Sequence, residues 1–173
     1  MGRICDPIEK RTQRLGFTLV EAVVSMLIVS VMFVAALSTV GASRLSQFKT
    51  SRASRGQALA ESLMAEILRQ DYLDPNGTPV FGPESGEAGA TRAAFDDVDD
   101  YHGWSSSPPT NRDGTAISAM EGWQRSVTVE WVDPMDVTQV QGSETNAKRV
   151  TVTVSVDNMP VATLVAIRTN WEL

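Results

Sequence analysis

The sequence predicts an α+β fold in which one long N-terminal helix packs on a small antiparallel β-sheet. An apolar run of 26 residues, 17–42, contains a single charged side chain, Glu21. No proline interrupts residues 17–73, and apolar side chains continue there at three- and four-residue steps, as in an amphipathic helix. Nearer the C-terminus, valine alternates with threonine and serine over residues 149–156, which is the period of a half-buried strand.

The apolar run 17–42 is long enough to cross a membrane. A helix of this length extends about 39 Å, whereas the hydrocarbon core of a bilayer is about 30 Å thick. An acidic side chain in a membrane span costs about 2.5–3.5 kcal/mol at the centre, and such residues usually serve a function. We therefore expect a transmembrane helix in which Glu21, near one end, is a candidate functional residue.

A short polar leader, residues 1–16, precedes this helix and ends in glycine. The segment Gly16-Phe17-Thr18-Leu19-Val20-Glu21 resembles the processing site of type IV prepilins and type II secretion pseudopilins. The strong resemblance covers roughly residues 11–42. It implies a pilin-like fold, cleavage by the prepilin peptidase between Gly16 and Phe17, and N-methylation of Phe17. It also implies that Glu21 pairs with the N-terminal amine of a neighbouring subunit during assembly.

The chemistry of the segment agrees with that pairing. A helix that begins at Phe17 has four unsatisfied N–H groups and a positive dipole end. A free or methylated α-amine keeps its charge below a pKa of about 7.7–8. Between packed apolar helices, an amine and the Glu21 carboxylate from adjacent subunits relieve each other's desolvation. A buried pair of this kind is better suited to fixing register than to adding stability.

Charge and cysteine content restrict the function further. Removal of residues 1–16 leaves 11 basic and 19 acidic groups, a net charge of −8, so we expect no nucleic-acid binding. The single cysteine, Cys5, lies in the leader, and the mature chain therefore has no disulfide. Major pilins of the type IVa class usually close a C-terminal loop with a disulfide and often have a proline within the span. Both departures favour a minor subunit, similar to minor pseudopilin I or to the D subunit of the mannose-sensitive haemagglutinin pilus.

Two other interpretations of the N-terminus stay open. An ordinary signal peptide cleaved after Ala42 is one, although the apolar run far exceeds the usual 7–15 residues of a signal core. A generic membrane anchor is the other. Basic residues flank both ends of the run, so the positive-inside rule does not decide the orientation. The resemblance implies a bacterial inner-membrane protein with a cytoplasmic N-terminus and an extracytoplasmic C-terminal domain.

Beyond the membrane, we expect the helix to continue amphipathically through residues 43–73 and to end at the turn sequence Asp74-Pro75-Asn76-Gly77. Gly41 and Gly56 weaken it by about 1 kcal/mol each relative to alanine. We expect them to serve helix packing, to have no specific role, or to allow local melting or bending on filament assembly. The expected apolar stripe comprises Leu45, Phe48, Leu59, Leu63, Met64, Ile67 and Leu68. Four basic residues follow the membrane run and are expected to contact lipid headgroups or acidic groups of neighbouring subunits, whereas the net charge disfavours DNA capture: Arg44, Lys49, Arg52 and Arg55.

Residues 74–122 form an acidic region rich in Gly and Pro, which we expect to be loop. Within it, residues 95–104 are aromatic and acidic and resemble a segment of the same D subunit. We expect the aromatic side chains to anchor this loop and its aspartates to face water. Hard cations take clustered carboxylates, so a calcium site is the alternative for Asp96, Asp97, Asp99 and Asp100. The only histidine, His102, is expected to pack rather than to bind metal.

Residues 123–173 are expected to form the antiparallel sheet. Strands are predicted at 123–132, 149–156 and 161–169, with Val127, Val129 and Trp131 on one face of the first. The turn at 157–160 implies a hairpin, and residues 133–147 form a connection. No catalytic motif, cofactor site or phosphate-binding loop is evident, so no enzyme is expected.

Together, these features predict a minor pilin or pseudopilin that initiates, caps or modifies a filament. The partners that the resemblance implies are other pilin subunits, the prepilin peptidase, the inner-membrane assembly platform and membrane lipid. A tethered extracytoplasmic binding protein that never polymerises, and that uses the acidic loop for calcium or a ligand, is the alternative.

Overall fold

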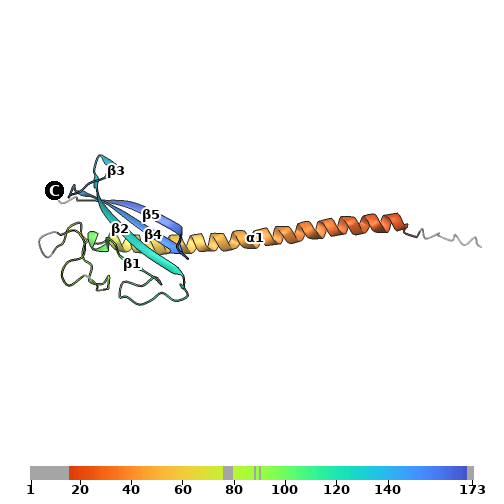
Figure 1. Cartoon of the computed structure of the whole chain (residues 1–173), viewed down its shortest axis with the longest axis horizontal. Coiled ribbons are helices and arrows are strands. Elements are labelled where there is room, and N and C mark those ends of the chain that lie inside the picture. The colour runs from red at the N-terminus through yellow and green to blue at the C-terminus, as the bar shows by residue number, and fades with distance from the viewer. Residues whose placement is uncertain (1–15, 76–79, 88, 90, 171–173) are drawn as a thin grey trace, which may run out of the picture. The chain divides into compact units, whose positions relative to one another are not determined.

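A computed structural model describes residues 16–75, 80–87, 89 and 91–170. The chain divides into two units, residues 1–47 and 48–173. Its helices are the α-helix α1 (Leu19–Ile67) and the 3₁₀ helix η1 (Asp99–Tyr101). Its strands are β1 (Ser105–Ser106), β2 (Trp123–Asp133), β3 (Asp136–Val140), β4 (Ala147–Val156) and β5 (Met159–Thr169). The predicted class is confirmed, because a long apolar N-terminal helix is followed by an antiparallel sheet on which its C-terminal turns pack, a pilin-like α+β architecture (Figure 1).

The sheet has the strand order β1-β2-β4-β5, and β3 pairs separately with β2. All of these pairs are antiparallel. Strands β2, β4 and β5 correspond to the three predicted strands. Valine pairs such as Val127↔Val152 and Val129↔Val150 place buried side chains opposite each other on the inner face. The β4–β5 hairpin turns through Asp157 and Asn158, whose positive φ angles of 52° and 64° fit a two-residue type I′ turn.

Two strands fall in segments that were predicted as loop or connection. Strand β3 lies within the expected connection 133–147 and pairs with β2 through Val132↔Val140. All five β3 residues are exposed, so the strand has no buried face to produce an alternating pattern. Strand β1 contains only two serines.

The inner face of the sheet packs against the last turns of α1. Leu59, Leu63 and Ile67 are buried in one cluster with the inward valines of β2 and β4. The helix approaches β5 so closely at Gly56 that a side chain would clash there: an added Cβ would lie 2.8 Å from Val161 Cγ2. Helix packing, rather than bending, therefore accounts for this glycine.

The predicted helix differs from α1 in its end point and in its stripe. Helix α1 ends at Ile67, six residues before the predicted end, and the turn residues Asn76 and Gly77 lie outside the described residues. The backbone leaves the helix because Asp71 pairs with the loop, accepting from Val98 N at 3.1 Å and donating to Asp96 O at 3.2 Å. Leu45 and Phe48 were expected in the buried stripe but are 57% and 58% exposed. The buried stripe thus begins later, at Gly56.

Candidate functional site

The predicted processing site lies at the beginning of α1. Gly16, Phe17 and Thr18 precede the helix, and the Phe17 side chain is 80% exposed. Thr18 caps the helix, because its Oγ1 accepts from Glu21 N at 3.2 Å. The residue spacing Thr-x-x-Glu is that of a capping box. The cap starts the helix at a fixed place and puts Glu21 in its first turn, where the dipole favours an acid.

Glu21 is exposed, and within the described residues no side chain forms a hydrogen bond or ion pair with its carboxylate. The part of the chain that contains residues 1–15 is not described. Around Glu21, the helix surface is apolar and open. The carboxylate is therefore free to accept a partner from outside the described chain.

The apolar part of α1 has the composition of a membrane span. Its most apolar 18-residue window has a mean hydropathy of 2.5, and none of that window is buried. Some of the hydroxyl groups of this segment donate to carbonyl groups of the same helix. Ser30 Oγ donates to Met26 O at 2.7 Å, and Thr39 Oγ1 donates to Ala35 O at 2.9 Å. The segment consequently presents no unsatisfied hydroxyl donor at these positions to an apolar environment.

The aspartates of the acidic loop do not face water, which corrects the prediction. Asp97, Asp99 and Asp100 are 2%, 3% and 1% exposed, and Asp96 is partly buried. Their carboxylates bind groups that are distant in the chain or backbone N–H groups of the same turn. The amino-acid composition of the loop does not indicate either kind of partner. Asp99 forms a buried ion pair with Lys148, and its Oδ2 accepts from Gly82 N at 3.0 Å.

Asp97 and Asp100 cap the two ends of one turn reciprocally. Asp97 Oδ1 accepts from Asp99 N at 2.7 Å and from Asp100 N at 3.2 Å. Asp100 Oδ2 accepts from Asp96 N at 2.9 Å and from Asp97 N at 3.1 Å. Burial and the nearby Asp99 charge raise the pKa of Asp97 to about 8. These carboxylates hold η1 in place. Among the described residues, the close group of carboxylate oxygens that could hold a metal ion includes Asp100 but not Asp96, Asp97 or Asp99.

Asp100 nevertheless belongs to a different acidic cluster. One carboxylate oxygen each of Glu84, Glu87 and Asp100 lies within 4.8 Å of the others. The two glutamates are partly buried. Burial and the neighbouring Glu84 raise the pKa of Glu87 to about 7. Sequence analysis missed this cluster, because the glutamates lie 13 and 16 residues before Asp100.

His102 packs, as predicted. Its Nδ1 lies 2.7 Å from Val129 O, and its ring contacts Phe81 with centroids 5.0 Å apart. It fastens the end of η1 to β2.

A second buried polar network, not foreseen from the sequence, ties the loop to α1. Arg92, 2% exposed, binds both carboxylate oxygens of Glu66, at 2.9 and 3.3 Å. Its guanidinium lies 4.2 Å from the Trp104 ring centroid, and Tyr101 Oη donates to Glu66 at 3.1 Å. Arg125 on β2 is also buried, and burial lowers its pKa to about 10. These groups order the loop but form no reactive arrangement.

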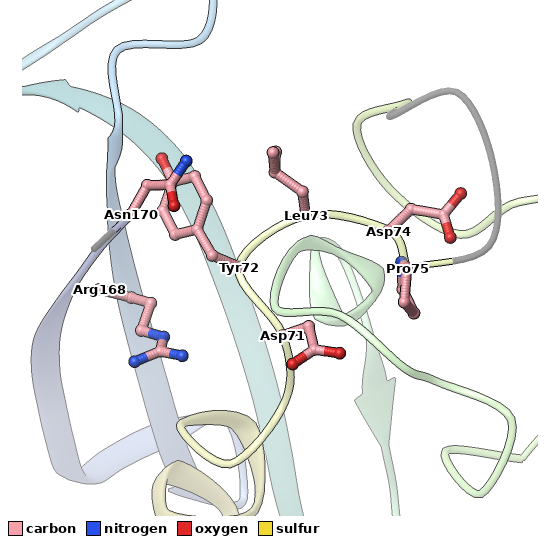
Figure 2. Close-up of a pocket in the computed structure, with 7 residues that line it drawn as sticks. All are labelled: Asp71, Tyr72, Leu73, Asp74, Pro75, Arg168 and Asn170. Atoms are coloured by element: carbon pink, nitrogen blue, oxygen red, sulfur yellow. The ribbon is translucent and has the colours of Figure 1, made fainter. Parts of the chain in front are cut away.

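A cavity of about 400 Å³ lies beside the chain end of β5 (Figure 2). Arg168 lines it and donates to Gln70 O at 3.4 Å. Asp71 and Asp74 lie on the opposite side of the cavity from the strand. Because a guanidinium and two carboxylates share its wall, the cavity does not select a ligand of one charge.

Of the four basic residues after the apolar run, Arg52 has contacts within its own chain. It lies 3.5 Å from Asp157, and its guanidinium stacks 4.8 Å from the Phe48 ring centroid. Both partners of the ion pair are substantially exposed, so the pair adds little stability. Binding to lipid or to a neighbouring subunit stays a prediction for the group.

Residues 11–37 match a family model described as the prokaryotic N-terminal methylation motif. The matched range contains Gly16, Phe17 and Glu21. No curated protein and no solved structure shows a significant match to the chain. A methylation motif followed by one long apolar helix fits a protein anchored in the inner membrane. The motif and the helix together support a type IV pilin-like or pseudopilin-like precursor.

Proposed function

We propose that this chain is a minor subunit that initiates, caps or modifies a type IV pilus or a type II secretion pseudopilus. The match of residues 11–37 to the methylation motif is the observation that carries the proposal. On this proposal, the prepilin peptidase cleaves between Gly16 and Phe17 and methylates Phe17. The mature chain is then anchored in the inner membrane, with its C-terminal domain outside the cytoplasm. From there, the assembly platform adds it to a filament.

On this proposal, Glu21 sets the axial position of each subunit relative to its neighbours in the filament. After cleavage, the new α-amine lies two residues before the helix begins, and the carboxylate four residues later lies in its first turn. An amine of one subunit and Glu21 of another neutralise each other only when the helices have the correct axial offset. Leaving one partner of a buried pair uncompensated costs about 3–5 kcal/mol. Wrong offsets are therefore disfavoured strongly enough to set register.

The apolar surface of α1 supports a subunit that moves from lipid into a helix bundle. Exposed side chains such as Leu27, Val31 and Phe33 cover the helix. In the bilayer these groups contact lipid tails, and in a filament they contact equivalent helices. The same surface thus serves both states without a change of fold. The sheet domain supplies partner specificity, as expected of a minor subunit of the pseudopilin I or haemagglutinin-pilus D kind.

Mass spectrometry of the native, membrane-extracted protein tests the processing step. The expected N-terminus is methylated Phe17. A start at Ser43 would mean an ordinary signal peptide, and an intact Met1 would leave a tethered protein. Either result contradicts the proposal.

Filament incorporation tests the role of Glu21. Glu21→Ala should reduce incorporation at least tenfold without lowering the membrane level of the processed chain. Glu61→Ala is the matched control, since Glu61 is an exposed glutamate of the same helix. Equal incorporation of both variants would show that the Glu21 charge is not used in assembly.

A further inference from the structure

Three carboxylates converge near η1 without a cation to balance them. Glu84, Glu87 and Asp100 each place one oxygen within 4.8 Å of the others. Within residues 80–87, 89 and 91–170, no ion pair involves any of the three. The nearest buried lysine, Lys148, is already paired with Asp99. Such a concentration of negative charge is costly unless it binds a proton or a cation.

Two oxygen atoms of this cluster are buried and lack a donor. Asp100 is 1% exposed, and its Oδ1 has no hydrogen-bond partner among the described residues, whereas Oδ2 accepts two backbone N–H groups. Glu84 Oε1 is likewise buried and unpartnered. A buried polar atom without a partner costs about 1–3 kcal/mol. The oxygen of a buried carboxylate that no N–H reaches is a ligand atom still available for a metal ion.

The scaffold holds these atoms in place before any ion binds. Glu84 and Glu87 lie three residues apart in a turn, where Glu87 N donates to Glu84 O at 3.1 Å. This turn is joined to η1, because Gly82 N donates to Asp99 Oδ2 at 3.0 Å. Asp100 is fixed by the reciprocal caps with Asp97. Two separate segments of the loop therefore present their carboxylates to one point.

We propose that Glu84, Glu87 and Asp100 bind one divalent cation, Ca²⁺ in preference to Mg²⁺. Hard cations take oxygen ligands, and Ca²⁺ accepts irregular geometry, whereas Mg²⁺ demands an octahedron. The two glutamates are only partly buried, so water completes the coordination shell. A site with three protein carboxylates and several waters fits the weak class of extracellular sites, with a Kd of about 0.1–1 mM. The ion would tie residues 84–87 to η1, and this role is independent of filament assembly.

The full chain in detergent, stripped with EDTA and titrated with CaCl₂ or MgCl₂, tests the site. We expect one Ca²⁺ per chain by calorimetry, a rise in the melting temperature, and at least tenfold weaker binding of Mg²⁺. Glu84→Gln and Glu87→Gln should each weaken Ca²⁺ binding at least tenfold. Both side chains are partly exposed, so these variants are expected to fold. Glu121→Gln, which removes one exposed charge from the same region, is the matched control and should bind normally.

Two results would overturn the site. Absence of Ca²⁺ binding, together with a higher melting temperature of Glu87→Gln in EDTA, would show that the cluster is neutralised by a shared proton only. Unchanged binding in both glutamine variants would place the ion elsewhere in the chain.

Discussion

Lys148 is a fully buried charge on strand β4. It is 1% exposed, donates to Asp99 and to Tyr72 O, and lies 4.4 Å from the Tyr72 ring centroid. Its ammonium group thus joins β4, η1 and the segment after α1. A buried ion pair contributes little net stability, but the loss of one partner leaves the other charge unpaired in the core.

Lys148→Met should therefore lower the free energy of unfolding by about 3–5 kcal/mol, measured by urea denaturation. The double variant with Asp99→Asn should recover part of this loss, because it removes the unpaired carboxylate. Arg149→Met is the control: Arg149 pairs with Glu130 where both side chains are partly exposed to solvent, and solvent-screened pairs contribute about 1 kcal/mol or less. Equal losses in the two single variants would contradict the buried pair.

Asp97 makes the stability of the domain depend on pH. Its pKa is raised from 3.8 to about 8, first by burial and then by Asp99. The folded state therefore binds a proton that the unfolded state releases between these values. The contribution of Asp97 to stability is greatest below about pH 4 and is lost as the pH rises toward 8. In EDTA, the wild-type protein should lose stability relative to Asp97→Asn over this interval, and parallel pH profiles would contradict the assignment.

These residue roles were not accessible from the sequence. A run of aspartates among Gly, Pro and Ser resembles a solvated loop, and the partner of Asp99 is 49 residues away. Arg92 and Glu66 are likewise 26 residues apart. The N-terminal segment is different, because Thr18 and Glu21 interact at a separation of three residues. Glu21 was singled out because it is the only charge in the apolar run and because residues 16–21 resemble a prepilin processing site, whereas the cap itself was not foreseen.

At the scale of elements, the strands with a buried face were the ones that the sequence predicted best. Strands β2 and β4 have one buried face, and the alternation of their side chains predicted them. Strand β5 has only partly buried and exposed residues, and the turn that precedes it predicted it. Strand β3 has only exposed residues. The end of α1 was misplaced because a tertiary contact of Asp71, rather than a proline or glycine, ends the helix.

The contact between α1 and β5 gives a test of helix packing. Gly56→Ala adds a Cβ only 2.8 Å from Val161 Cγ2. Overpacking costs about 1–3 kcal/mol, whereas the gain in helix propensity is about 1 kcal/mol. We expect net destabilisation by thermal or urea unfolding, and its relief when Val161→Ala is combined with it. Gly41→Ala is the control, since an added Cβ there meets nothing within 4 Å. Stabilisation by Gly56→Ala alone would contradict the close approach.

At the scale of the whole chain, the two units differ in what stabilises them. Every member of the buried core, from Leu59 to Val156, belongs to the unit of residues 48–173. The most apolar window of α1 contributes no buried residue. The first unit is therefore expected to depend on lipid or on other helices for its burial, whereas the second contains its own core.

A fragment that begins at Phe48 should consequently fold alone. We expect it to be soluble, to keep the circular dichroism signature of α-helix and β-sheet, and to unfold with a free energy within about 1 kcal/mol of the full chain. Because the two units share no buried core, removing the first unit should leave the free energy of unfolding of the second nearly unchanged. The fragment should also lose membrane association, because the apolar run is absent. Cooperative unfolding of the full chain in detergent, together with an unfolded fragment, would mean that the first unit is needed to complete the second.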